Sequence, residues 1–127
     1  MLNPIRFTLR KEDKIVLKAE FDLVRNAGKK YVGPTLVAVV CPDERVRCGV
    51  VCGKKYSLLA VKRNRARRLL WESFRLLKPY LKPCRIVLIP RKGLMSAKCQ
   101  ATQKELAKLL TKAGVLHQET VISQSME

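Results

Sequence analysis

One stretch of the sequence, KRNRARRLLWESFRLL at residues 62–77, constrains the fold of this chain more than any other. At 100° per residue most of its apolar side chains fall on one side of a helix and its charged side chains on the other, so this helix must pack against a core. Its first seven residues carry five positive charges and no negative one. Cations at a helix N-terminus oppose the helix dipole. Local stability therefore does not explain these residues, and the pattern predicts a negatively charged partner.

The charge of the whole chain supports the same interpretation. The 127 residues carry a formal net charge of +17, and the isoelectric point is near 10.2. Self-repulsion of that size destabilises a compact state unless counter-charge is supplied. Residues 45–104 contain 17 of the 27 Lys and Arg residues but only one acid, Glu72. The middle of the chain is therefore predicted to bind a large polyanion.

Length and composition predict one domain over residues 1–127, with a core at residues 14–114 and loose ends on either side. No apolar run approaches the roughly 20 residues that a membrane span needs, and the N-terminus lacks the apolar segment of a secretory signal. Five cysteines, an odd number, favour free thiols in a reducing compartment over a disulfide framework. We therefore expect a cytoplasmic protein without a membrane partner.

Hydrophobic periodicity and turn residues predict seven elements in the order α-β-β-β-α-β-α. The strands are expected at residues 31–32, 35–41, 46–52 and 85–89. The first two helices are expected at residues 15–26, with Gly28 as the stop, and at residues 59–77. Ser96 is expected to cap a last helix that Gly114 ends, with a core face made of Cys99, Leu106, Leu109, Leu110 and Ala113. This order predicts an α+β fold, a two-layer domain with helices packed on a small mixed sheet.

A run of charges is most often a solvated helix face, but solvated faces usually mix the two signs. Here Glu72 is the only acid available. Arginine outnumbers lysine by four to one in the cluster, and guanidinium groups bind phosphates through two parallel hydrogen bonds. Asn64 adds an amide that both donates and accepts. Phosphates of a nucleic acid are therefore the predicted ligand.

Residues that could carry other chemistry are isolated. Four cysteines form no Cys-x-x-Cys pair and lie in predicted strands or directly beside one, where they are expected to pack as small apolar residues: Cys41, Cys48, Cys52 and Cys84. The single histidine, His117, lies near the C-terminal tail without an acid-base partner. A protein nuclease needs clustered carboxylates or a positioned acid and base. We therefore expect no catalytic residue, no metal site and no small-molecule substrate in this chain.

The residues of the basic helix resemble those of a known family. Arg63-Asn64-Arg65, followed by RRLL at residues 67–70 and ESFR at residues 72–75, is similar to the RNR helix in the protein subunit of bacterial ribonuclease P. The likeness extends to Lys54-Lys55 before that helix and to Phe21 in the first predicted helix. It also includes IVLIPRKG at residues 86–93, and it covers roughly residues 14–114.

This resemblance implies a ribonucleoprotein endonuclease that removes the 5′ leader from precursor tRNA. The RNA subunit, which requires Mg²⁺, would carry the chemistry, and the protein would assist without a cofactor of its own. The implied partners are the ribonuclease P RNA and precursor tRNA. The resemblance also implies a left-handed β-α-β crossover around the basic helix, against the usual right-handed rule.

By position, the resemblance assigns two surfaces. The surface for RNA is expected to comprise Lys54, Lys55, Lys62, Arg63, Asn64, Arg65, Arg67, Arg68, Arg75 and Arg91. A cleft for the leader, between the first helix and the sheet, is expected to include Phe21, Lys54 and Lys55. Replacement of Arg65 and Arg68 by Ala is expected to weaken assembly with the RNA and to leave the fold intact.

Three residues depart from the family pattern. Trp71 stands where a basic residue is usual, Arg25 where a second aromatic residue is common, and Gly53 where a small hydroxyl residue or Ala is common. Trp71 is expected either to stack on a base or under an Arg, or to pack against a neighbouring loop. Without a second aromatic residue, binding of the leader would depend more on charge and hence on salt.

Two other classes of protein fit the charge. A ribosomal or other structural RNA-binding protein would bind RNA without any effect on cleavage of precursor tRNA. A DNA-binding module with its basic helix in a major groove would prefer duplex DNA to structured RNA. Neither class explains the rest of the likeness.

Overall fold

The computed structural model describes residues 9–116. Its main helices are α1 (Lys18–Ala27), α2 (Ala60–Leu77) and α3 (Cys99–Lys112), and its strands are β1 (Lys29–Val32), β2 (Leu36–Pro42), β3 (Arg47–Val50) and β4 (Cys84–Pro90). Short 3-10 helices lie at η1 (Lys11–Asp13), η2 (Lys78–Tyr80) and η3 (Lys92–Ser96). The element order confirms the predicted α-β-β-β-α-β-α arrangement and the α+β class.

The four strands form one mixed sheet in the order β1-β2-β4-β3. β2 pairs antiparallel with both β1 and β4, whereas β3 pairs parallel with β4. A parallel pair needs a long crossover connection, and α2 supplies it between β3 and β4. The predicted left-handed sense of this crossover stays a prediction.

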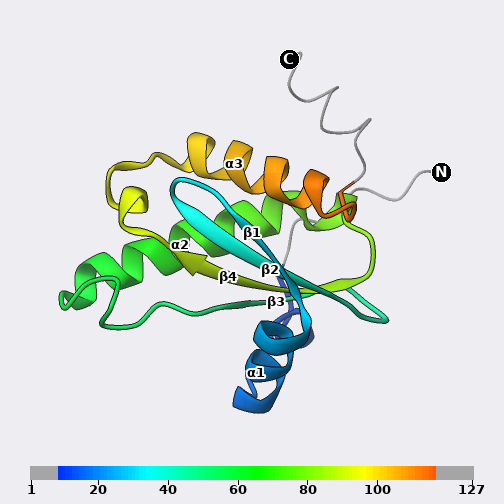
Figure 1. The fold of residues 1–127 in the computed structure, drawn as a ribbon. Helices are drawn as coiled ribbons and strands as arrows, with labels where there is room; N and C mark the ends of the chain where they lie inside the picture. The colour runs from blue at the N-terminus through cyan, green and yellow to red at the C-terminus, as the bar shows by residue number, and fades with distance from the viewer. Residues whose placement is uncertain (1–8, 117–127) are drawn as a thin grey trace.

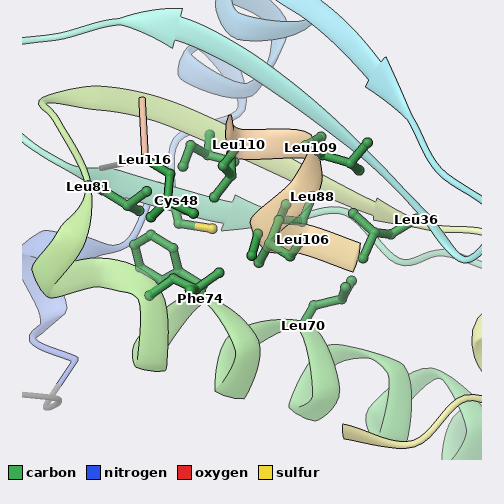
Figure 2. Close-up of a cluster of buried hydrophobic side chains, with 14 of the residues drawn as sticks. Leu36, Cys48, Leu70, Phe74, Leu81, Leu88, Leu106, Leu109, Leu110 and Leu116 are labelled. Carbon is green, nitrogen blue, oxygen red and sulfur yellow. The ribbon is translucent and has the colours of Figure 1, made fainter. Parts of the chain in front are cut away.

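Both faces of the sheet carry apolar residues because β2 and β4 alternate apolar side chains between the two faces. α2 and α3 cover one face, and α1 lies against the other (Figure 1). On the α2–α3 side, Phe74 and Leu70 of α2 meet Leu88 of β4 and Leu106 of α3, and all four are fully buried (Figure 2). This face holds the larger core, and it fixes the position of α2.

The smaller core lies under α1. Val24 of α1 packs with Val39 of β2 and Val87 of β4, and Ile15 joins them from the segment before the helix. Phe21 is half-buried at the edge of this cluster. α1 therefore covers its face only in part, and apolar sheet residues remain accessible beside it.

Two predicted helix starts are wrong, the first because of a contact that is distant in sequence and the second because of a local one. α1 begins at Lys18, not at residue 15, because the N–H of Ile15 donates to the carbonyl of Cys48 at 2.9 Å and holds this segment extended. Lys98, not Ser96, precedes α3, and the Ser96 hydroxyl donates back to the carbonyl of Gly93.

The predicted helix stops are confirmed. α1 ends before Gly28, and α3 ends before Gly114, which has a φ of +76°. That backbone conformation favours glycine. His117 and the polar tail lie outside the described residues. Within residues 9–116, no helix combines the length and the apolar character that a bilayer crossing requires.

Candidate nucleic-acid interface

The segment between β3 and α2 carries two of the predicted cations. Lys54 and Lys55 are exposed, and they lie between two buried side chains, Cys52 and Tyr56. The N–H of Tyr56 donates to the carbonyl of Gly53 at 3.0 Å and closes a turn. The lysines are therefore presented to solvent by a turn that is anchored on both sides.

The first turns of α2 carry the rest of the basic cluster. Lys62, Asn64 and Arg68 are exposed, while Arg63, Arg65 and Arg67 are half-buried. Among residues 9–116, the side chains of Lys54, Lys55, Lys62 and Arg68 make no hydrogen bond or ion pair within the protein. These four cations are available to an external anion.

The half-buried arginines bind backbone carbonyls. Arg63 Nη1 donates to the carbonyls of Ser57 and Leu58, both at 3.0 Å. Arg67 Nη2 donates to the carbonyl of Cys52 at 2.7 Å, and its Nη1 donates to Asn64 Oδ1 at 3.2 Å. Two arginines of α2 therefore hold the loop that carries Lys54 and Lys55, and they fix it relative to the helix.

Arg65 binds a different segment of the chain. Its Nη1 donates to the carbonyls of Leu94 and Met95 at 3.1 and 3.2 Å, and its Nη2 donates to the carbonyl of Ala97 at 2.6 Å. These three carbonyls belong to η3 and the residue after it. Arg65 therefore joins the start of α2 to the connection between β4 and α3.

The two remaining predicted cations have intramolecular contacts as well. Arg75 forms an ion pair with Glu72 and donates hydrogen bonds to its carboxylate. These hydrogen bonds lower the pKa of the Glu72 carboxyl although partial burial opposes the shift. The exposed Arg91 donates from Nη1 to the carbonyl of Gly33 at 2.8 Å. Arg91 precedes η3, so the segment that Arg65 holds also brings Arg91 towards the same end of the molecule.

The predicted leader cleft corresponds to the face on which α1 lies. The ring of Phe21 lies directly over Gly49 of β3, where a Cβ atom would be only 2.4 Å from Phe21 Cε1. A row of half-buried or exposed side chains crosses the same face from β1 past β4: Val32, Val37, Ile89 and Val51. We call this row the apolar strip. The loop between β3 and α2, which carries the paired lysines, runs away from α1 (Figure 1).

Trp71 packs within the protein. Its ring meets that of Phe74 edge to face, with 6.3 Å between the centroids, and it packs against the larger core. The ammonium group of Lys14 lies over the Trp71 ring at 5.1 Å, within cation–π range. Of the two expectations for Trp71, the structure favours packing.

A network of ion pairs between α1 and the sheet was missed by sequence reasoning. Asp43, in the β2–β3 turn, pairs with Arg47 at 3.2 Å and with Arg85 at 3.0 Å, and Arg47 also pairs with Glu20 of α1. Burial alone would raise the pKa of the Asp43 carboxyl, but hydrogen bonds from Arg85, from the Glu44 N–H and from Arg47 outweigh burial and lower it. This network anchors α1 at one end of the sheet.

The described residues contain no group of three or more His, Cys, Asp or Glu side chains that could hold a metal ion. The five cysteines are free. Cys48 and Cys84 are buried, and burial raises the pKa of Cys84 to about 12. Both lie in strands and pack in the larger core, as the sequence predicts.

The mixed sheet, the basic start of α2 and the lysine turn define a basic α+β protein of the nucleic-acid-binding type. The family model for Ribonuclease P matches residues 9–114. The chain therefore belongs to the ribonuclease P protein family, whose members are subunits of the ribonuclease P holoenzyme, an endoribonuclease that processes tRNA. Membership implies association with the ribonuclease P RNA.

Relatives and solved structures agree with this assignment. The ribonuclease P protein component of Herpetosiphon aurantiacus is 31% identical over 119 residues, which cover 91% of this chain and 96% of that protein. The component of Oceanobacillus iheyensis is 34% identical, over 85% of this chain and 92% of that protein.

Among solved structures, a mutant RNase P protein of Staphylococcus aureus matches with a TM-score of 0.76 at 25% identity, over 84% of this chain and 92% of that one. The Thermotoga maritima protein matches with a TM-score of 0.70 at 27% identity, over 78% of this chain and 96% of that one.

Sequence reasoning also missed a group of aliphatic side chains at the start of α2. Leu58, Leu59 and Val61 are exposed, although their residue types favour burial. A signal was available in the sequence, because these residues immediately precede the basic cluster and Val61 lies outside the apolar side of the helix that residues 66–77 define.

Proposed function

We propose that this protein subunit of ribonuclease P binds the catalytic RNA through the turn at Lys54-Lys55 and the first turns of α2. In this proposal the whole chain acts as a single RNA-binding domain in the cytoplasm. The observation that carries it is the combination of four exposed cations without a partner among residues 9–116 and three arginines held by backbone carbonyls. A polyanion with many phosphates matches that surface.

We further propose that the apolar strip beside α1 binds the 5′ leader of precursor tRNA. Unstacked bases of a single strand can lie on apolar and aromatic side chains, and Phe21 borders the strip. Because Arg63 and Arg67 hold the loop of the paired lysines against the start of α2, we assign Lys54 and Lys55 to the RNA subunit first. Their role toward the leader stays a prediction.

The chemistry of leader removal belongs, in this proposal, to the RNA subunit with its Mg²⁺. The one acid within the basic window, Glu72, forms an ion pair with Arg75, which lowers its pKa and does not suit it to act as a general acid near neutral pH. The protein supports the reaction by binding and orienting the two RNA molecules.

The decisive experiment adds the purified full-length chain to a bacterial ribonuclease P RNA at low Mg²⁺ and measures cleavage of precursor tRNA. We expect stimulation by the wild-type chain and weaker stimulation by the Lys54→Ala/Lys55→Ala variant. Lys112→Ala removes an exposed cation at the far end of α3 and serves as the matched control. Binding without stimulation would instead indicate a structural RNA-binding protein.

Binding should also fall steeply with salt. If roughly six phosphates are neutralised, a plot of log affinity against log salt should have a slope of about −4 to −5. A slope near zero would remove the electrostatic basis of the proposal.

A further inference from the structure

The start of α2 exposes an unusual concentration of aliphatic surface. Leu58, Leu59 and Val61 are 80%, 59% and 79% exposed, and Ala60 between them is also exposed. Single exposed aliphatic residues are ordinary on protein surfaces, but here three large ones stand within four consecutive residues. We call Leu58, Leu59 and Val61 the aliphatic patch.

The backbone under the aliphatic patch is held in place. Arg63 donates to the carbonyls of Ser57 and Leu58, and the N–H of Leu59 donates to Ser57 Oγ at 3.1 Å. The patch residues themselves do not pack against either core cluster of the described chain. A segment that is fixed by hydrogen bonds, yet directs its large apolar side chains to solvent, is preorganised for an external contact.

Charge around the patch selects its partner. Lys54, Lys55, Lys62 and Arg68 are exposed on the same loop and helix start, without internal partners among residues 9–116. A second copy of the chain would bring two such clusters together and would be repelled. A partner that combines dense negative charge with flat apolar surfaces satisfies both features, and RNA with unpaired bases is such a partner.

We infer that the aliphatic patch packs against unpaired bases of the ribonuclease P RNA, while the surrounding cations bind the phosphates on either side. This inference rests on the proposed function and adds a contact that does not depend on charge. Phosphate contacts release counterions and weaken with salt, whereas apolar contacts with bases do not. The two contributions can therefore be separated by their salt dependence.

The test measures binding of the full chain to ribonuclease P RNA, without precursor tRNA, at several salt concentrations. The triple variant Leu58→Ser/Leu59→Ser/Val61→Ser should bind roughly tenfold more weakly at every salt concentration, with an unchanged log–log slope. Ser suits the position of Leu59, because Leu59 precedes the first residue of α2 and Ser is a favoured helix cap. Val16→Ser, at a side chain that is 72% exposed before α1, is the matched control and should bind like wild type.

A second measurement identifies the contact on the RNA. Base-specific chemical modification should show a few unpaired bases that the wild-type chain protects and the triple variant leaves reactive. Hydroxyl-radical cleavage of the RNA backbone should show the same protected region with both proteins, because the phosphate contacts remain. Loss of both kinds of protection in a folded triple variant would overturn the inference.

Further outcomes would overturn either the inference or the proposed function. A triple variant that binds RNA like wild type would overturn the inference and leave the proposed function intact. The same holds if the patch mediates a dimer in sedimentation, or binding to phosphatidylserine-containing vesicles, with no effect on RNA affinity. Failure of the wild-type chain to bind the RNA would instead overturn the proposed function, and the inference with it.

Discussion

Replacing Arg65 by Ala is expected to destabilise the protein, whereas replacing Arg68, three residues along the same helix, is expected to leave its stability unchanged. The two residues look alike in the sequence, which predicts that both variants keep the fold intact. In the structure the Arg65 guanidinium donates to three carbonyls of the β4–α3 connection. Arg68 is exposed and has no internal partner among the described residues.

The size of the effect follows from these contacts. A hydrogen bond within a protein contributes a net free energy of roughly 1 kcal/mol, so losing three should cost about 2–3 kcal/mol. For a chain of this length that corresponds to a decrease in Tm of roughly 10 °C. Loss of an exposed side chain such as Arg68, which has no partner within residues 9–116, should change stability by less than about 0.5 kcal/mol.

Thermal and urea-induced unfolding of the RNA-free variants provide the measurement, and binding to the RNA is measured in parallel. Arg65→Lys is the informative control, because it keeps the charge but cannot span three carbonyls with a planar fork. The Arg65→Lys variant should lose most of the stabilisation that the Arg65 hydrogen bonds contribute. It should retain the salt dependence of RNA binding. An Arg65→Ala variant that unfolds at the wild-type temperature would refute the positioning role of Arg65.

Three further predictions concern the rest of the molecule. The pKa of the Asp43 carboxyl is lowered below its ordinary 3.8, so its ion pairs stabilise the fold above that pH and stop doing so as the pH falls through the folded-state pKa. Asp43→Asn should therefore reduce the decrease in Tm that the protein shows at acid pH. A decrease of unchanged size would contradict this. Burial raises the pKa of Cys84 to about 12, so mass spectrometry should find it modified by a thiol reagent far more slowly than the half-buried Cys99, and equal rates would be inconsistent with the packing. Gly49→Ala should displace the Phe21 ring and lower the free energy of unfolding by about 1–2 kcal/mol. In a Phe21→Ala background the same substitution should lower it much less. Additive losses in a double-mutant cycle would rule out the contact.

Features that depend on local periodicity could be predicted from the sequence. α2 was recognised because its apolar residues recur at helical spacing, and its observed bounds, Ala60–Leu77, differ from the prediction by one residue at the start. The stop at Gly114 was recognised because a left-handed backbone conformation favours glycine there. Such signals are carried by side chains within one or two turns of each other.

Features that depend on distant contacts could not be predicted. The extended conformation of Ile15 depends on the carbonyl of Cys48, and the insertion of β4 between β2 and β3 depends on the packing of the whole sheet. For Arg63, Arg65 and Arg67 the sequence predicts phosphate binding and contact with the RNA, but not their hydrogen bonds within the protein. All but one of the acceptors of these arginines among residues 9–116 are backbone carbonyls, which every residue type provides and which the sequence therefore cannot reveal; the exception is Asn64 Oδ1.

Because the arginines at the start of α2 donate to carbonyl groups, the positive electrostatic potential there is not reduced. Orienting an arginine with a carboxylate would cancel its charge, as the pairing of Glu72 with Arg75 does further along the same helix. A carbonyl oxygen is only a dipole, so Arg63, Arg65 and Arg67 are immobilised at no loss of formal charge. The helix start thus combines rigid geometry with an undiminished positive potential, which is the condition for fast, oriented encounter with a polyanion.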